Sequence, residues 1–174
     1  MASKQFEKFD WHTLGDITLG RSNLGQSMPV IVYRLMQYTV IAELRSRYGE
    51  DEANDIIRSA GFRAGVAFAQ NVLEPTNDFS TYIANLQLKL KELSIGILRI
   101  EKADLDKLDI VLTVSEDLDC SGLPVTDDTV CVYDEGFIGG IFYDFTGKIF
   151  NVREIDCWAT GDRTCRFVAK VDEA

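Results

Sequence analysis

The first half of the chain repeats its apolar residues at helical spacing. This pattern predicts three helices, from Pro29 to Gly49, from Glu50 to Leu73 and from Phe79 to Leu93. The first is apolar on more than one face, which predicts a largely buried helix. The second contains a run of small residues, which favours close helix packing or leaves room beside the backbone for another group: Ala60, Gly61, Ala64, Gly65 and Ala67.

The second half of the chain alternates apolar and polar residues, which is typical of strands. Four strands are predicted, within residues 95–103, 109–118, 147–159 and 164–174. A glycine-containing helix is predicted between them, from Cys131 to Tyr143. Helices that precede a set of strands indicate an α+β fold, with N-terminal helices packed on an antiparallel sheet and one inserted helix. We expect an N-terminal arm over residues 1–27 and a single domain over residues 28–174.

The charge of the chain excludes some classes of partner. Its 28 acidic residues outnumber 18 basic ones, and the formal net charge is −10. Direct binding to nucleic acid or to an anionic membrane is therefore not expected, since both need a basic face. No apolar run approaches the roughly 18–20 residues of a membrane span, and the N-terminus lacks the apolar core of a signal peptide. We expect a cytoplasmic protein with reduced thiols.

The stretch EIDCWATGDRTC, from Glu154 to Cys165, raises the question of a shared site. Cys157 and Cys165 flank a predicted turn, and a twist or bulge would aim Glu154 to the same place. A disulfide, a metal site and chance proximity all remain open, because lone buried cysteines usually act as small hydrophobic residues. If a metal binds, thiolates select zinc, and a closed shell of four ligands would be structural.

The same residues resemble the 4-vinyl reductase-type, or hydrocarbon-binding, domain family. The resemblance lies in Cys131 before GFIGG, in Glu154-x-x-Cys157, in Gly161-Asp162 and in Cys165 with Phe167; a weaker one extends over the helices from about residue 25. In the sensory domains of aromatic-responsive bacterial activators, which belong to this family, three cysteines and a glutamate hold zinc. The resemblance therefore implies a zinc site formed by Cys131, Glu154, Cys157 and Cys165. Cys120 is left over, and a thiol without a role is the favoured interpretation.

The family resemblance also implies a fold shared with TRAPP vesicle-tethering subunits and haem-based nitric-oxide sensors. It implies a stand-alone sensor or binding domain, with a hydrophobic or aromatic ligand in a buried pocket between helices and sheet. Candidate pocket residues are Tyr82, Ile110, Leu112, Phe137, Val152 and Trp158, although plain core packing explains each of them equally well. Near the zinc, Arg153, Arg163 or Arg166 would compensate the negative charge.

Two other functions remain open from the sequence. Related domains dimerise, so a homodimeric, TRAPP-like scaffold with a separate signalling partner is one alternative. A tetrapyrrole-related reductase accessory protein is another. Catalysis is not expected, because His12 is the sole histidine and lies in the arm, where a surface role is favoured. GDITLGRSNLG lacks the spacing of a dinucleotide fingerprint.

Overall fold

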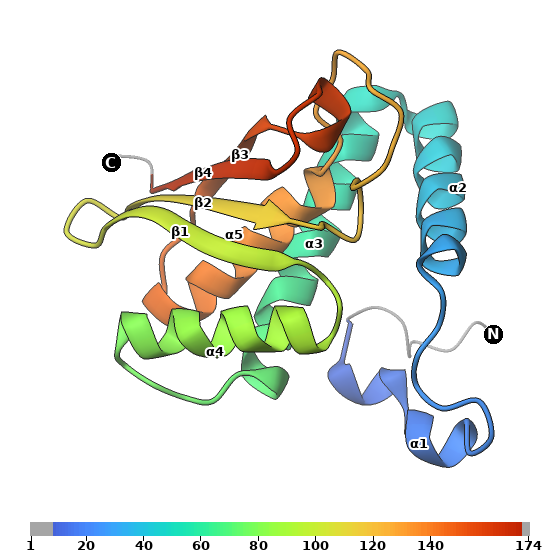
Figure 1. Cartoon of the computed structure of the whole chain (residues 1–174), viewed down its shortest axis with the longest axis horizontal. Coiled ribbons are helices and arrows are strands. Elements are labelled where there is room, and N and C mark those ends of the chain that lie inside the picture. Colours follow the sequence, from blue (N-terminus) through green and yellow to red (C-terminus); the bar gives the residue numbers. More distant parts are fainter. Residues whose placement is uncertain (1–8, 172–174) are drawn as a thin grey trace.

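A four-stranded antiparallel sheet lies against helices α3 and α5 in the computed structural model, which describes residues 9–171 (Figure 1). The strands follow the order β1-β2-β4-β3, so the two strands that flank the last turn pair with each other. Their bounds are Ile97–Asp104 for β1, Asp109–Ser115 for β2, Asn151–Asp156 for β3 and Cys165–Lys170 for β4. The predicted α+β class is confirmed.

The long helices begin and end where the local signals placed them. They are α2 (Val30–Tyr48), α3 (Glu50–Val72), α4 (Phe79–Glu92) and α5 (Val132–Thr146). Gly49 separates α2 from α3 with a φ of 81°, a backbone angle that favours glycine. Asp78 caps α4 by accepting the backbone N–H of Thr81 at 2.8 Å. Three short helices complete the described chain: η2 (Trp11–Leu14) and α1 (Ile17–Gly20) in the arm, and η3 (Trp158–Thr160) between β3 and β4.

Helix α2 stands to one side of the other elements (Figure 1) and contains no buried residue. The prediction of a largely buried first helix is therefore wrong. Its inner face turns toward α3 and the loop after β2, whereas Ile31, Leu35 and Met36 are 72, 66 and 60% exposed on the outer face. An apolar residue pattern on all sides indicates burial only when other elements cover every side. No helix within residues 9–171 is long and apolar enough to cross a membrane.

Helices α3 and α5 approach each other closely through glycines on both sides. A methyl group added at Gly65 would lie 2.1 Å from the carbonyl oxygen of Phe137, and one added at Gly140 would lie 2.2 Å from that of Phe62. Gly61 and Gly136 are equally crowded by the backbone of the opposite helix. The small residues of the second helix therefore do serve close packing. This contact fixes where α5 lies beneath the sheet.

The glycine contact predicts opposite effects for two neighbouring substitutions in α5. Gly140→Ala should lower the free energy of unfolding by about 1–3 kcal/mol, because the added methyl group has no space between the helices. Gly139→Ala is the matched control, since its added methyl group would meet no atom closer than 3.6 Å. That substitution should be neutral or stabilising by up to about 1 kcal/mol through helix propensity. Urea denaturation of both variants measures the difference, and equal stabilities would contradict this account.

Candidate metal site and adjoining cavity

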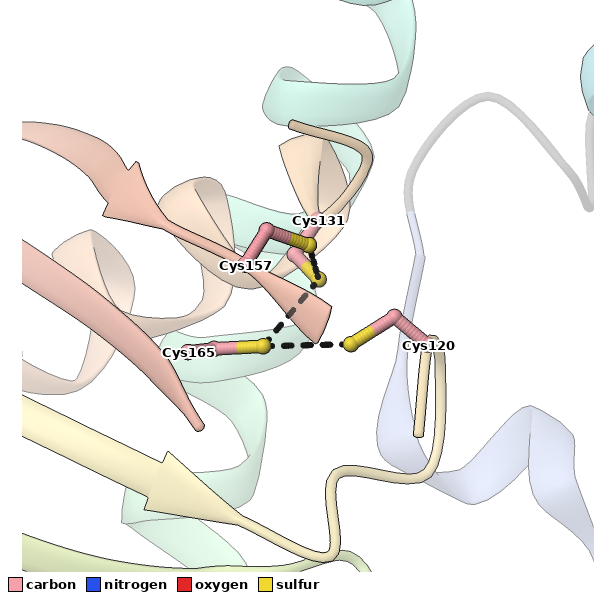
Figure 2. Close-up of side chains that lie close together, drawn as sticks. All are labelled: Cys120, Cys131, Cys157 and Cys165. Atoms are coloured by element: carbon pink, nitrogen blue, oxygen red, sulfur yellow. Dashed lines mark hydrogen bonds between the residues drawn. The ribbon is translucent and has the colours of Figure 1, made fainter. Parts of the chain in front are cut away.

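Four cysteines from separate segments converge at one end of the sheet (Figure 2). Cys120 lies in the loop after β2, and Cys131 is the residue immediately before α5. Cys157 follows β3 and caps η3, and Cys165 is the first residue of β4. All four side chains are at most 1% exposed, and none forms a disulfide. The predicted convergence of Cys157 and Cys165 is confirmed.

The distances between the sulfur atoms suit a single metal ion. The four Sγ atoms all lie within 4.8 Å of one another. Cys131 Sγ lies 3.9 Å from that of Cys157 and 3.8 Å from that of Cys165, while Cys120 and Cys165 are separated by 3.1 Å. Tetrahedral zinc with bonds of about 2.3 Å places its sulfur ligands roughly 3.8 Å apart. The donor set therefore fits zinc in both chemistry and spacing.

Cys120 is the residue that the sequence analysis missed. Its favoured interpretation was a thiol without a role, whereas the structure places it among the other three sulfur atoms. Asp117 explains its position, because the carboxylate Oδ1 accepts the backbone N–H groups of Asp119 and Cys120 at 2.7 and 3.3 Å. The only signal in the sequence was an aspartate three residues before a cysteine, which favours such a turn.

Helix α2 holds the Cys120 loop from its outer side. The guanidinium of Arg34 donates to the carbonyl oxygens of Leu118 and Ser121 at 2.7 and 2.9 Å. The hydroxyl of Tyr33 donates to the Asp119 carboxylate at 2.8 Å. These bonds are polar, so they attach α2 to the loop without burying its apolar side chains. Helix α2 and the position of Cys120 are therefore linked.

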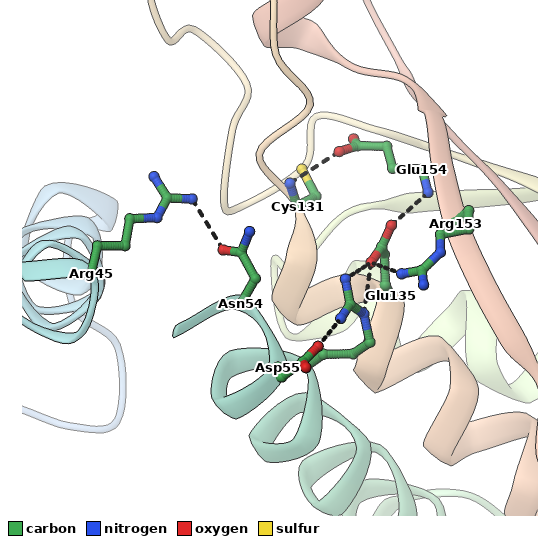
Figure 3. Close-up of polar contacts among 8 residues, drawn as sticks. Arg45, Asn54, Asp55, Cys131, Glu135, Arg153 and Glu154 are labelled. Carbon is green, nitrogen blue, oxygen red and sulfur yellow. Dashed lines mark hydrogen bonds and ion pairs between the residues drawn. The ribbon is translucent and has the colours of Figure 1, made fainter. Parts of the chain in front are cut away.

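Glu154 lies beside the cluster but makes a different contact from the four cysteines. Its Oε2 atom accepts the backbone N–H of Cys131 at 3.0 Å (Figure 3). Its Oε1 atom is buried and has no hydrogen-bond partner among residues 9–171. The pairing of β3 with β4 shifts register between Glu154 and Asp156, and this irregularity is the bulge expected to orient the carboxylate. Glu154 is thus a neighbour of the sulfur cluster, and either it or Cys120 can supply a fourth ligand.

Glu135 joins three elements behind the cluster (Figure 3). Its carboxylate accepts hydrogen bonds from Arg58 of α3 at 2.8 and 2.9 Å and from Arg153 of β3 at 3.2 Å. It also accepts the backbone N–H of Glu154 at 3.0 Å. This buried carboxylate is therefore fully paired, and it fixes β3 against the first turn of α5.

The arginines expected to compensate the site bind other carboxylates. Arg153 pairs with Glu135, and Arg166 pairs with Glu101 and Asp156. Arg163 lines a groove on the outer side of the Cys120 loop. In residues 9–171, no lysine or arginine forms an ion pair with Asp117, Asp134 or Glu154. The charge compensation predicted from Arg153 and Arg166 is thus not observed.

Burial and crowding change the protonation of the groups around the cluster. Hydrogen bonds from the neighbouring thiols, that of Cys120 first, lower the pKa of Cys157, so one thiolate is stabilised by the others. Burial raises the pKa of Glu154 to about 8 and that of Asp117 to about 7, because a charged carboxylate is poorly solvated there. A divalent cation would offset this accumulation of negative charge.

An apolar cavity of about 30 Å³ adjoins the cluster, between α4, α5, β1 and β2. Asp117 and Asp134 form its polar end, and both carboxylates lie within 4.8 Å of Cys131 Sγ. Its other lining side chains are apolar: Leu86, Leu90, Ile95, Leu98, Leu112, Val114, Phe137, Ile138, Ile141 and Phe142. This volume holds about two water molecules, so an organic ligand enters only if the lining side chains move.

Two of the six candidate pocket residues, Leu112 and Phe137, line this cavity. The others lie elsewhere in the structure. Tyr82 is buried in α4, where its hydroxyl donates to the carbonyl oxygen of Ile141 at 2.9 Å. Ile110 and Val152 are buried core residues of β2 and β3. Trp158 donates its Nε1–H to a backbone carbonyl at 3.1 Å and lines the outer groove.

His12 lies on η2, where its side chain is exposed. The surface position favoured by the sequence analysis therefore agrees with the structure. The arm also exposes Leu19 and Leu24, which are 80 and 78% accessible.

Comparison with known proteins supports the fold and the family. Residues 110–171, which hold β2, α5, β3, β4 and all four cysteines, match the family model of the 4-vinyl reductase domain. A Methanocaldococcus jannaschii protein, the uncharacterised MJ0150, is 21% identical over 150 residues, which are 86% of this chain and 80% of that protein.

Three solved structures share the fold at low sequence identity. The phenol-responsive sensory domain of the transcription activator PoxR, determined with phenol, has a TM-score of 0.65 at 16% identity, over 84% of this chain and 76% of that one. A vinyl-4-reductase family protein of Methanocaldococcus jannaschii has a TM-score of 0.61 at 15% identity, over 99% of both chains. A trafficking protein particle complex subunit 3 of Naegleria fowleri, covalently bound to palmitic acid, has a TM-score of 0.63 at 10% identity, over 83% and 95%.

An H-NOX protein from S. oneidensis also aligns, with a TM-score of 0.52 at 16% identity over 79% of this chain and 74% of that one. The expected likeness to TRAPP subunits and nitric-oxide sensors is therefore confirmed at the level of the fold. The chain carries a 4-vinyl reductase domain over residues 110–171, which confirms the family that its cysteines, glutamate and glycines predicted.

Proposed function

We propose that this protein is a stand-alone sensor domain that binds a hydrophobic or aromatic small molecule beside a structural zinc site. One observation carries the proposal: the apolar cavity and the sulfur cluster are contiguous, because Asp117 and Asp134 line the cavity and lie within 4.8 Å of Cys131 Sγ. A ligand in the cavity would therefore act on the segments that hold the metal. The PoxR domain with phenol and the trafficking subunit with palmitic acid are precedents for apolar ligands in this fold.

The zinc would be held by Cys131, Cys157 and Cys165, with Cys120 as the fourth ligand. When bound, zinc supplies positive charge and a rigid four-way link between segments. The cysteines bring together the loop after β2, the start of α5 and the β3–β4 turn. Such a link would fix the end of α5 that also forms the polar end of the cavity. Reduced thiols in this role suit the cytoplasm, which is where we place the protein.

Ligand binding would require α4 and α5 to move apart slightly. Their facing residues include Leu86 and Leu90 of α4 and Phe137 and Ile141 of α5, which all line the cavity. Helix α5 is held on its opposite side by the glycine contact with α3. Helix α4 contacts mainly β1 and can shift with less disruption. The response to a ligand would then pass from α4 through the cavity to the Cys120 loop and α2.

A second candidate function is a homodimeric interaction domain, which the outer face of α2 favours. This face exposes Ile31, Leu35, Met36 and Val40 on a helix with no buried residue. Contiguous apolar surfaces of this kind commonly mark protein interfaces. A second copy is the favoured occupant, because most soluble oligomers are symmetric homo-oligomers. A dimer through α2 is compatible with the sensor function, since α2 also holds the Cys120 loop.

Native mass spectrometry of the purified chain tests the sensor proposal. We expect about one zinc ion per chain, together with a small organic molecule that dissociates on denaturation or is taken up from added apolar compounds. Elemental analysis of the same sample identifies the metal. A chain that carries no metal when purified without chelator, and that binds neither phenols nor fatty acids, would contradict the proposal.

Substitutions at the two candidate fourth ligands distinguish the two zinc sites. Cys120→Ser should remove zinc and lower stability by roughly 4 kcal/mol, since loss of a structural metal is among the largest single effects. This corresponds to a decrease of about 8–16 °C in Tm. Glu154→Gln is the matched control, because its amide oxygen can still accept the N–H of Cys131, and it should retain zinc. The reverse result, with zinc lost only from Glu154→Gln, would establish the set of three cysteines and a glutamate.

The oligomer prediction needs a charge on the outer face of α2. Leu35→Glu should convert a dimer into a monomer in size-exclusion chromatography with light scattering, because the buried charge would be unpaired. Ser46→Glu adds the same charge to an exposed position near the end of α2 and should leave the dimer intact. If the unchanged protein is already a monomer at high concentration, the interaction-domain function is wrong.

A further inference from the structure

The cavity beside the cluster has one polar end, and that end is entirely acidic. Among the described residues, Asp117 and Asp134 are its only charged lining residues, and the remainder of the lining is apolar. A pocket of this kind orients its ligand through its few polar groups, so their chemistry indicates the ligand class. Carboxylates accept hydrogen bonds and attract positive charge, and they repel a ligand that carries a carboxylate.

The carboxylate of Asp134 lacks a donor in the folded protein. Its Oδ2 atom has no contact with solvent and no hydrogen-bond partner within the described part of the chain, although the residue as a whole is half-buried. Asp134 is the third residue of α5, a position that commonly bonds to the N–H before the helix. That N–H belongs to Cys131 and is already bonded to Glu154. The helix dipole favours an acidic residue here, but it supplies no donor to this atom.

Asp117 adds a second negative group without a cation. Its Oδ1 atom accepts the two backbone N–H groups that shape the Cys120 loop. The nearest arginine contacts do not neutralise it, because the guanidinium of Arg34 donates to backbone carbonyl oxygens. The two carboxylates lie within 4.8 Å of each other, which leaves space for one cationic group between them.

The other unpaired carboxylate in this region has a local explanation. Asp119 accepts from Tyr33, and its remaining oxygen has no partner in the described chain. The side-chain oxygen of Gln37, which is within bonding reach of Asp119, is unpaired as well. Turning over the Gln37 amide would satisfy both atoms, because amide oxygen and nitrogen are interchangeable in placement. Asp134 has no such neighbour in residues 9–171, so only its carboxylate indicates a missing ligand.

We propose that the pocket binds an apolar amine, whose ammonium group lies between Asp117 and Asp134 and whose hydrocarbon part extends between α4 and α5. This inference rests on the proposed ligand-binding function and specifies its ligand class. The present volume of about 30 Å³ accommodates an ammonium group at the polar end, while the hydrocarbon part displaces the α4 side of the lining. Charge-assisted hydrogen bonds in a buried site would give the amine its advantage over a neutral ligand.

Isothermal titration calorimetry of the metal-loaded full chain tests the proposal with matched ligands. The probes are benzylamine, benzyl alcohol and benzoate, and the corresponding six-carbon linear amine, alcohol and acid, all near neutral pH. In at least one series, we expect the amine to bind about tenfold or more tightly than the alcohol. The acid should show no binding, because its charge would face two carboxylates.

Two substitutions on the same helix separate this contact from a general charge effect. Asp134→Asn keeps the shape of the side chain and should weaken amine binding about tenfold while leaving alcohol binding unchanged. Asp144→Asn removes the same charge from a residue of α5 that does not line the cavity, and it should affect neither ligand. Unchanged zinc content and Tm in both variants would show that the fold and the sulfur cluster are intact.

The possible failures have different meanings. Equal binding of amine and alcohol, or no loss in Asp134→Asn, would overturn the amine proposal and leave the ligand-binding function standing. If no probe of either series binds, and no organic molecule accompanies the purified protein, both proposals are wrong. A second metal equivalent that disappears in Asp134→Asn would also overturn the amine proposal, because a metal ion would then occupy the acidic end.

Discussion

The contact between α3 and α5 is the constraint on which the rest of the structure depends. Gly65 and Gly140 each meet the backbone of the opposite helix, and no side chain larger than hydrogen fits there. The two helices consequently behave as one rigid layer beneath the sheet. The first turn of α5 carries Asp134 and Glu135, and Cys131 directly precedes it. The position of the metal site and of the cavity's polar end is therefore set by packing several turns away.

A buried ion-pair network transmits that position to the sheet. Glu135 joins α5 to Arg58 of α3 and to Arg153 of β3. It also accepts the N–H of Glu154, which in turn accepts the N–H of Cys131. These bonds align the end of β3 with the start of α5, so Cys157 and Cys131 are close before any metal binds. Pre-alignment of this kind lowers the entropy that metal binding must offset.

Local signals in the sequence predicted the elements, while non-local ones decided the site. Helix ends followed Gly49 and Asp78, and strand alternation followed from burial of one face, so these were readable from short windows. Cys120 was not, because an irregular loop shaped by Asp117 brings it to the cluster. The exposure of α2 was also hidden, since a helix that is apolar all round gives no information about which side is covered. Pocket residues such as Leu112 have the same composition as core residues such as Ile110, so only the fold separates them.

The acidity around the cluster connects the metal with the ligand. Four buried thiols and the carboxylates of Asp117, Asp134 and Glu154 have no paired lysine or arginine in residues 9–171. A zinc ion with four thiolates still leaves the site at about −2, so it cannot neutralise the carboxylates as well. Two ways remain to reduce this charge: protonation of the carboxylates, which burial favours, or a cation at the cavity. A cationic ligand and the metal would then stabilise each other's sites through the shared field. The acidic end of the cavity is in this sense part of the metal site, and a ligand bound there would alter how firmly the Cys120 loop is held.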